Sequence, residues 1–337
     1  MTAPLACIFG CGGVALTDDE RRLYRDSNPL GFILFQRNCQ TPDQIRALIA
    51  EMRRCVGRAD APVLIDQEGG RVQRLKPPVW RKAPAAAVIG DLARRSLSRA
   101  IEAARLNARL IAEELASLGF TADCAPVLDL RLAITHQAIG DRAYSDDPAV
   151  VSALGRAACE GFIAGGIIPV PKHMPGHGRA VCDSHIELPR VSASADELER
   201  TDFAPFHALR DMPWAMTAHI LFTALDPSAP ATASKVVIDK VIRGSIGFQG
   251  LLFSDDLSMQ ALEGTLRQRA ERALAAGCDV ALHCNGSMDE MRQIAEGIAP
   301  LTPAALERVA TGRRLLNGGE RIDIAAAQAR FDALMAA

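Results

Sequence analysis

Eight short apolar runs with the character of β-strands recur along the chain, and segments with helical spacing separate them. Alternating strands and helices are typical of a parallel sheet, and eight such units predict a sheet closed into a (β/α)8 TIM barrel. An open, doubly wound sheet is the structural alternative, because counting strands does not distinguish the two. The expected strands are Leu5–Phe9, Gly31–Phe35, Pro62–Asp66, Thr121–Ala125, Ile167–Lys172, Ala215–His219, Leu251–Asp255 and Asp279–His283.

The chain has no Gly/Ser-rich linker, low-complexity tract or internal repeat, so we expect a single domain over residues 1–337. Barrels of this class commonly exceed the roughly 100–200 residues of an average domain. Helical patterns lie at Arg94–Leu118 and at Thr41–Cys55, with Thr41 as a candidate N-cap. The tail from about Thr302 also reads as helix, and we expect it to pack on the outside of the barrel.

Composition excludes several classes of protein. A net charge of −2 gives no general field for nucleic acid. No window reaches the roughly 18 apolar residues of a membrane helix, and the N-terminal stretch lacks the features of a secretion signal. Nine cysteines, an odd number, are expected to be reduced thiols. We therefore expect a cytoplasmic protein, and the 4% aromatic content favours a small soluble substrate.

Polar residues stand at the ends of five expected strands. In a barrel the carboxyl ends of all strands meet on one face, where active sites lie. A single polar residue there could simply terminate its strand, but five ends together indicate one shared pocket. The residues are Asp66, Lys172 with His173, His219, Asp255 and His283.

The segment Asp66-Gln67-Glu68-Gly69-Gly70 directly follows the third expected strand. Paired glycines allow positive φ or close backbone approach, and Asp66 and Arg74 could both reach into a cleft. A phosphate-binding loop fits poorly, because no Lys-Ser/Thr follows the glycines.

Three of the seven histidines lie between His173 and His185, in a segment whose Pro and Gly residues predict a loop. A zinc site is one interpretation of these histidines. His173 and His177 straddle a Pro-Gly turn, which disfavours helical placement of two ligands. The alternative is a proton-transfer pair, in which the carboxylate of Asp183 orients the imidazole of His185.

Asp255 and Asp256 follow the seventh expected strand. Adjacent acids there could cap a helix, a role that suits Asp256 or Ser258 better than Asp255. Asp255 stands at the strand terminus, where a carboxylate would face the shared pocket.

These segments together give a specific resemblance. DQEGGRVQRL (66–75), IGDRAYSDDP (139–148), KHMPGHG with DSH (172–185), MTAHI (216–220) and FSDDLSM (253–259) occur in that order. In this respect the chain resembles glycoside hydrolase family 3, in particular its single-domain bacterial β-N-acetylglucosaminidases of cell-wall recycling. The resemblance covers most of the chain.

The resemblance implies a role for each matching residue. Asp255 would be the nucleophile, and His185, paired with Asp183, the general acid/base. His177 would order the loop without touching the sugar, and no metal or cofactor would be needed. The residues that would bind N-acetylglucosamine are Asp66, Arg74, Arg142, Lys172 and His173.

Three departures from the family pattern bear on the edge of the pocket. Met174 stands where the family usually has Phe, and Ala143-Tyr144-Ser145 continues atypically after Arg142. The stretch Lys76–Pro84 also differs from the usual barrel rim. None of the three removes an expected catalytic residue.

The implied reaction is retaining hydrolysis of small N-acetylglucosaminides, such as peptides of GlcNAc-1,6-anhydroMurNAc. Retaining enzymes usually pair two carboxylates about 5 Å apart, and an Asp-supported His is a sensible replacement for one of them. We expect a saccharide as partner, neither nucleic acid nor membrane, and a monomer. Three alternatives remain open: a phosphorylase, a β-glucosidase or xylosidase of the same family, and a non-catalytic binding barrel.

Overall fold

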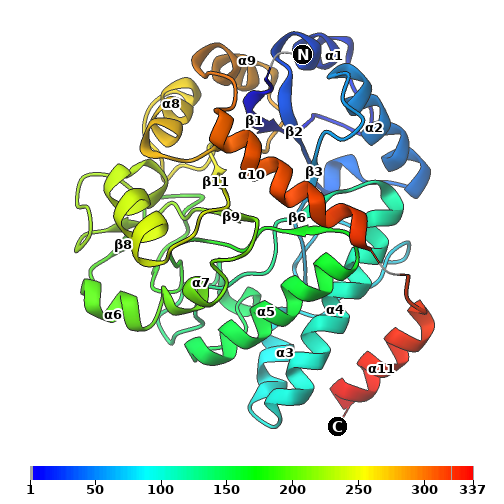
Figure 1. Ribbon diagram of the computed structural model, residues 1–337, viewed down its shortest axis with the longest axis vertical. Coiled ribbons are helices and arrows are strands. Elements are labelled where there is room, and N and C mark those ends of the chain that lie inside the picture. Colours follow the sequence, from blue (N-terminus) through cyan, green and yellow to red (C-terminus); the bar gives the residue numbers. More distant parts are fainter. Residues whose placement is uncertain (1–2, 320, 337) are drawn as a thin grey trace.

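The computed structural model describes residues 3–319 and 321–336. Among these residues, eight parallel strands form one sheet in the order β7-β6-β3-β2-β1-β12-β11-β9 (Figure 1). The strands are β1 (Leu5–Phe9), β2 (Pro29–Leu34), β3 (Val63–Ile65), β6 (Ala122–Asp123), β7 (Ile168–Pro169), β9 (Trp214–Met216), β11 (Leu251–Asp256) and β12 (Val280–His283).

Main-chain hydrogen bonds join the two ends of this sheet. Just beyond β7, Met216 N donates to Pro171 O at 3.0 Å and Met174 N donates to Met216 O at 2.8 Å. Ala218 N then donates to Met174 O at 2.8 Å. These bonds close the sheet, so the predicted barrel is confirmed and the open, doubly wound alternative is wrong.

Helices surround the barrel and follow local signals in the sequence. Thr41 caps α2 by accepting a hydrogen bond from Gln44 N at 3.3 Å, as its position predicted. The helical pattern at Arg94–Leu118 begins three residues later than expected, because Ser96 caps α4. The helices are α1 (Asp18–Ser27), α2 (Pro42–Cys55), α3 (Ala86–Ala93), α4 (Leu97–Leu118), α5 (Pro148–Ala164), α6 (Ala195–Arg200), α7 (Ala204–Ala208), a π-helix (Val237–Ser245), α8 (Leu266–Ala276), α9 (Met288–Gly297), α10 (Pro303–Arg314) and α11 (Ile324–Ala336).

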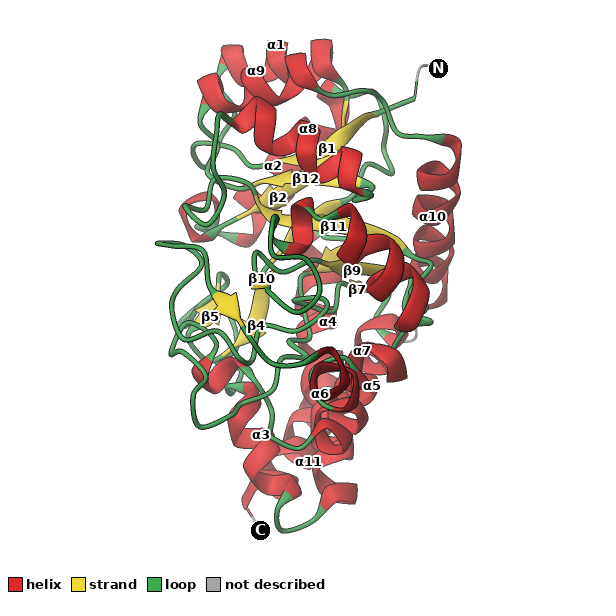
Figure 2. Ribbon diagram, turned by 90° about the vertical axis from the view of Figure 1, so that its left-hand side faces the viewer, coloured by secondary structure: helices red, strands yellow, loops and turns green. Residues whose placement is uncertain are grey.

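The tail forms two helices in different places. Leu301, Ala305 and Val309 join the cluster of apolar side chains inside the barrel, so α10 covers its amino-terminal end. Figure 2 shows α10 on one side of the barrel, with the hairpin β4 (Gln67–Gly69) and β5 (Val72–Gln73) among the loops on the other. The second helix, α11, packs against α4 and buries Phe331 and Leu334.

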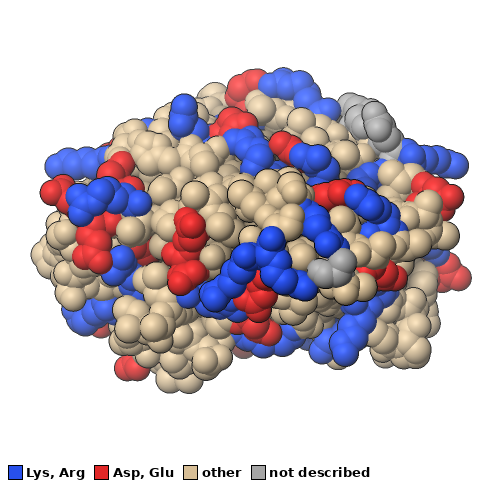
Figure 3. Space-filling view, turned by 90° about the horizontal axis from the view of Figure 1, so that it is seen from below, with Lys and Arg blue, Asp and Glu red and all other residues tan. Residues whose placement is uncertain are grey.

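Charged side chains of both signs are interspersed over the face seen in Figure 3, in keeping with the small net charge of the chain. No helix within the described residues is long and apolar enough to cross a membrane. None of the nine cysteines is paired in a disulfide in this structure.

Candidate active site

A cavity of about 350 Å³ lies at the carboxyl ends of the strands. Its walls come from strand ends and from the loops that follow them. All eight residues to which the sequence assigns catalytic or sugar-binding roles line this one cavity: Asp66, Arg74, Arg142, Lys172, His173, Asp183, His185 and Asp255.

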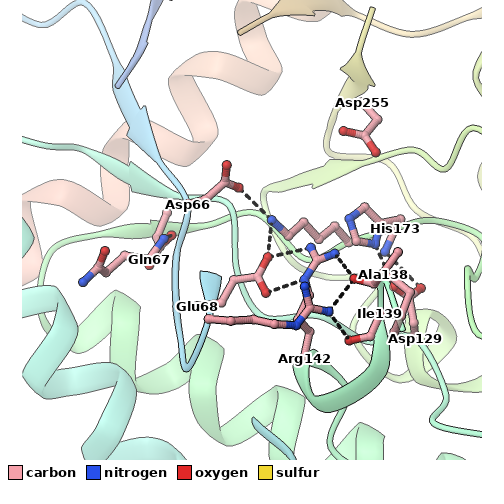
Figure 4. A network of polar contacts seen from close by, with 12 residues as sticks. Asp66, Gln67, Glu68, Asp129, Ala138, Ile139, Arg142, His173 and Asp255 are labelled. Atoms are coloured by element: carbon pink, nitrogen blue, oxygen red, sulfur yellow. Dashed lines mark hydrogen bonds and ion pairs between the residues drawn. The ribbon is translucent and has the colours of Figure 1, made fainter. Parts of the chain in front are cut away.

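A network of buried charges makes up one wall (Figure 4). The ammonium of Lys172 lies 2.7 Å from Asp66 Oδ1 and 2.7 Å from Glu68 Oε1. Arg142 binds Glu68 through two N–H groups, at 2.8 and 2.7 Å. Arg74 Nη2 donates to Asp66 Oδ2 at 3.0 Å. Every carboxylate here therefore has two cationic partners.

The cations hold both carboxylates in the ionised form. Burial alone would raise the pKa of Asp66, but Lys172 and Arg74 outweigh burial and lower it. In the same way Arg142 and Lys172 outweigh burial at Glu68 and lower its pKa to about 2. The wall thus offers fixed hydrogen-bond acceptors and donors to a polar ligand.

The β4–β5 hairpin explains why Arg74 returns to Asp66. Gly69 and Gly70 take φ values of 98° and 58°, which favour glycine, and turn the chain back on itself. The side chain of Gln67 then accepts hydrogen bonds from Arg74 N at 2.8 Å and Leu75 N at 3.0 Å. The DQEGG motif is therefore a turn that brings both ends of one segment to the same wall of the cavity.

Asp255 is the penultimate residue of β11, and its carboxylate faces the cavity. Its Oδ1 accepts a hydrogen bond from Asp256 N at 2.8 Å. Burial would raise the pKa of Asp255, but the nearby imidazoles of His173 and His219 contribute to a net lowering. The carboxylate is therefore ionised at neutral pH.

Asp256 does not cap a helix, contrary to one interpretation of the sequence. Its carboxylate accepts hydrogen bonds from Ser258 N at 3.1 Å and Ser258 Oγ at 2.6 Å, while α8 begins only at Leu266. It also accepts one from Cys284 N at 3.2 Å, so it fixes the turn after Asp255 to the end of β12.

Asp183 and His185 form the expected pair. The carboxylate Oδ1 lies 2.8 Å from His185 Nδ1 and also accepts a hydrogen bond from His185 N at 2.9 Å. The hydrogen bonds from His185 contribute to a lowered pKa for Asp183, although burial opposes them. The His185 side chain is 67% exposed, so its other nitrogen is accessible from solvent.

The other histidines of this loop are buried and differently bound. His173 Nδ1 lies 2.7 Å from Asp129 Oδ2, and His177 Nε2 lies 3.2 Å from Ser184 Oγ. Burial lowers the pKa of His177 to about 4, so its ring is neutral. No group of three His, Cys, Asp or Glu side chains in residues 3–319 and 321–336 is arranged to hold a metal ion.

Sequence reasoning missed the contributions of three residues. Glu68 stands inside the quoted DQEGG motif, yet nothing in its spacing distinguished it from a turn residue. Asp129 lies 44 residues before His173, and only the fold brings the two together. His219 was noted as a strand-end residue; its Nε2 donates to the main-chain oxygen of Asp256, the residue after Asp255, at 3.0 Å.

The residues of the three departures from the family pattern do not line the cavity. Met174 is buried and its main chain helps to close the barrel. Ala143, Tyr144 and Ser145 are buried as well. In the Lys76–Pro84 stretch, Arg81 contacts α4 and α11 rather than the cavity.

A closed barrel with a strand-end carboxylate and an Asp–His pair in one polar cavity is the arrangement of a glycoside hydrolase. The family model for the glycosyl hydrolase family 3 N-terminal domain matches residues 11–312. The chain belongs to this family.

Known relatives are similar to this chain along nearly its whole length. A β-hexosaminidase of Chromobacterium violaceum is 40% identical over 332 residues, which cover 94% of this chain and 90% of the relative. A β-hexosaminidase of Aromatoleum aromaticum is 38% identical over 303 residues, with 88% and 84% covered. The crystal structure of NagZ from Neisseria gonorrhoeae in complex with N-trifluoroacetyl-D-glucosamine matches with a TM-score of 0.88 and 32% identity, covering 99% and 98% of the two chains.

Proposed function

We propose that the chain is a retaining exo-β-N-acetylglucosaminidase that acts as a cytoplasmic monomer. Its substrates are small peptidoglycan fragments, peptides of GlcNAc-1,6-anhydroMurNAc, from which it removes the terminal sugar. Relatives named β-hexosaminidase and a structural neighbour that binds a glucosamine derivative support this assignment. The cavity of about 350 Å³ suits one sugar ring, with the leaving group towards the exposed His185.

The observation that carries the proposal is that Asp255 shares a cavity with the Asp183–His185 pair. Asp255 attacks the anomeric carbon while His185 gives its proton to the leaving oxygen, and the glycosidic bond breaks. His185 then takes a proton from water, which attacks the anomeric carbon and releases Asp255. Asp183 keeps the proton of His185 Nδ1 in place, so Nε2 exchanges the reacting proton.

The wall of buried charges binds the sugar. Asp66 accepts hydrogen bonds from hydroxyls, while Lys172, Arg74 and Arg142 donate from N–H groups that their carboxylate partners leave free. His173 presents Nε2 from the same side, because Asp129 occupies Nδ1.

Release of 4-nitrophenol from its β-N-acetylglucosaminide tests the proposal, with EDTA present throughout. Wild type is expected to be active, Asp255→Ala to lose nearly all turnover, and His185→Ala to lose about 10²–10⁴-fold with leaving groups that need protonation. A silent wild type, or full activity of Asp255→Ala, would contradict the assignment.

The same assay separates the alternatives. A phosphorylase would accelerate when inorganic phosphate is added and would release a sugar phosphate. A β-glucosidase would prefer 4-nitrophenyl β-glucoside. We expect phosphate to have no effect and the N-acetylated substrate to be preferred.

A further inference from the structure

A fully buried carboxylate outside the cavity holds two parts of the site at once. Asp129 follows β6, and its side chain has no exposed surface. Its Oδ2 lies 2.7 Å from His173 Nδ1, while its Oδ1 accepts hydrogen bonds from His173 N at 3.2 Å and His177 N at 2.7 Å. All three donors come from the five-residue segment that begins at His173.

At His173 this contact fixes the side chain that faces the sugar. A carboxylate only accepts hydrogen bonds, so Nδ1 carries the proton and Nε2 is left for the cavity. The rings of His173 and His177 also pack edge to face, with centroids 5.6 Å apart. A shift of one ring would therefore displace the other.

At His177 the contact continues towards the acid/base loop. The ring Nε2 of His177 lies 3.2 Å from Ser184 Oγ, and both side chains are buried. Ser184 stands between Asp183 and His185 and is the buried member of this otherwise exposed turn. The loop is also held from outside, where Ala261 N donates to Ser184 O at 3.2 Å.

An adjacent segment of the same chain leaves little room for the segment that begins at His173 to move. A side chain at Gly178 would place its Cβ 2.4 Å from Leu130 O, next to Asp129. The segments that carry Asp129 and His177 are therefore packed directly against each other. Small errors in the position of an acid/base group have large effects on rate. A fixed series of contacts from Asp129 to the loop would therefore help to keep the acid/base group in position.

We propose that Asp129 is a positioning residue that couples the sugar-binding His173 to the loop that carries His185, through His177 and Ser184. This proposal rests on the proposed function. It predicts that one buried group influences both sugar binding and proton transfer, although it touches neither substrate nor the reacting atoms.

Leaving-group dependence separates these two effects. Phenyl β-N-acetylglucosaminide needs protonation by His185, whereas the 2,4-dinitrophenyl analogue leaves without it. Ser184→Ala removes only the contact to the loop, so it should lower kcat/KM for the phenyl substrate by up to about tenfold, the range of a neutral hydrogen bond, and leave the dinitrophenyl substrate nearly unchanged.

Asp129→Asn should affect both substrates. The amide can still accept at one oxygen, but its NH2 group faces Nδ1 and forces the proton of His173 to Nε2. We expect kcat/KM to fall by about 10- to 100-fold for the dinitrophenyl substrate, the range for a lost hydrogen bond to a charged group, and further for the phenyl substrate. Ser152→Ala, on α5, is the matched serine control.

Equal losses on both substrates for Ser184→Ala, or none, would overturn the proposal, as would wild-type behaviour of Asp129→Asn. A merely structural role would lower both rates together. If wild type hydrolyses neither substrate, the proposed function fails and this inference falls with it. If wild type is active and the variants match Ser152→Ala, only the coupling is wrong.

Discussion

Three cations and two carboxylates lie within hydrogen-bond distance of one another in the wall of the cavity. A neutral sugar needs strong donors and acceptors, and charged side chains held in place by opposite charges provide both. Glu68 is the member that joins Lys172 to Arg142 and therefore holds the arrangement together.

Replacing Glu68 tests whether the charges in the cavity wall stabilise one another. Glu68→Gln keeps the shape but leaves two buried cations undercompensated, so we expect a loss of about 3 kcal/mol in the free energy of unfolding at pH 7. Urea unfolding measures it, and the exposed Glu307→Gln serves as control.

The difference in the free energy of unfolding between wild type and Glu68→Gln should depend on pH. The pKa of Glu68 is about 2 in the folded chain, below the ordinary value of 4.5, so its stabilisation is complete above pH 4.5 and is lost as pH falls towards 2. The advantage of wild type over Glu68→Gln should shrink by roughly half between pH 7 and pH 3. A difference that stays constant over this range would contradict the account.

The sequence predicted the residues that line the cavity more completely than the residues that hold those side chains in position. Asp66, Lys172 and Asp255 stand at strand ends, where a barrel brings side chains together whatever the loops do. Asp129 and Glu68 act through partners 44 and 74 positions away, and no local pattern encodes such pairs. The close spacing of Asp183 and His185 indicated a proton-transfer pair, whereas Arg142 came only from the resemblance.

The strands were predicted in number and order, but not in length. β6 and β7 are two residues long where five and six were expected. Their hydrogen bonds leave the regular ladder, as at the isolated bridge between Val127 and Lys172. The hairpin β4–β5 was not predicted, because its strands are too short for an alternating pattern.

In helix α10, replacing a glycine by alanine should lower the stability of the protein, although this exchange usually stabilises a helix. Alanine normally stabilises a helix by about 1 kcal/mol relative to glycine. At Gly312, however, a Cβ would lie 2.3 Å from Nε1 of the fully buried Trp214. We expect Gly312→Ala to lower the free energy of unfolding by about 1–3 kcal/mol.

Thr311→Ala, one position earlier on the exposed side of α10, is the matched control and should change stability by less than about 0.5 kcal/mol. Stabilisation by Gly312→Ala in thermal unfolding would show that α10 is not packed against the barrel end as described.

The chain also ties its C-terminal helix to the loop that follows the β4–β5 hairpin. Arg81 Nε donates to Gln328 Oε1 at 2.7 Å, and Nη1 donates to Asn107 Oδ1 at 2.8 Å. Its guanidinium lies 5.1 Å from the ring centroid of Phe331. One side chain thus joins α4, α11 and the segment that follows Arg74.

Arg81→Ala should lower the free energy of unfolding by about 1–2 kcal/mol and raise KM while kcat is largely retained, because Arg74 loses support. Arg330→Ala removes the exposed pairing of α11 with Glu102 and should leave KM unchanged. If KM is the same in both variants and in wild type, Arg81 does not support Arg74.

The proposed reaction requires a covalent intermediate on Asp255, and retention of the anomer alone does not prove it, because an acetamido group can itself act as nucleophile. The most direct measurement is peptide mass spectrometry after incubation with a 5-fluoro derivative of N-acetylglucosaminyl fluoride, which slows the second step. We predict one added sugar on the peptide that contains Asp255, and none in Asp255→Ala. A label on Asp256 or Asp66, or turnover of the reagent with no adduct, would contradict the account.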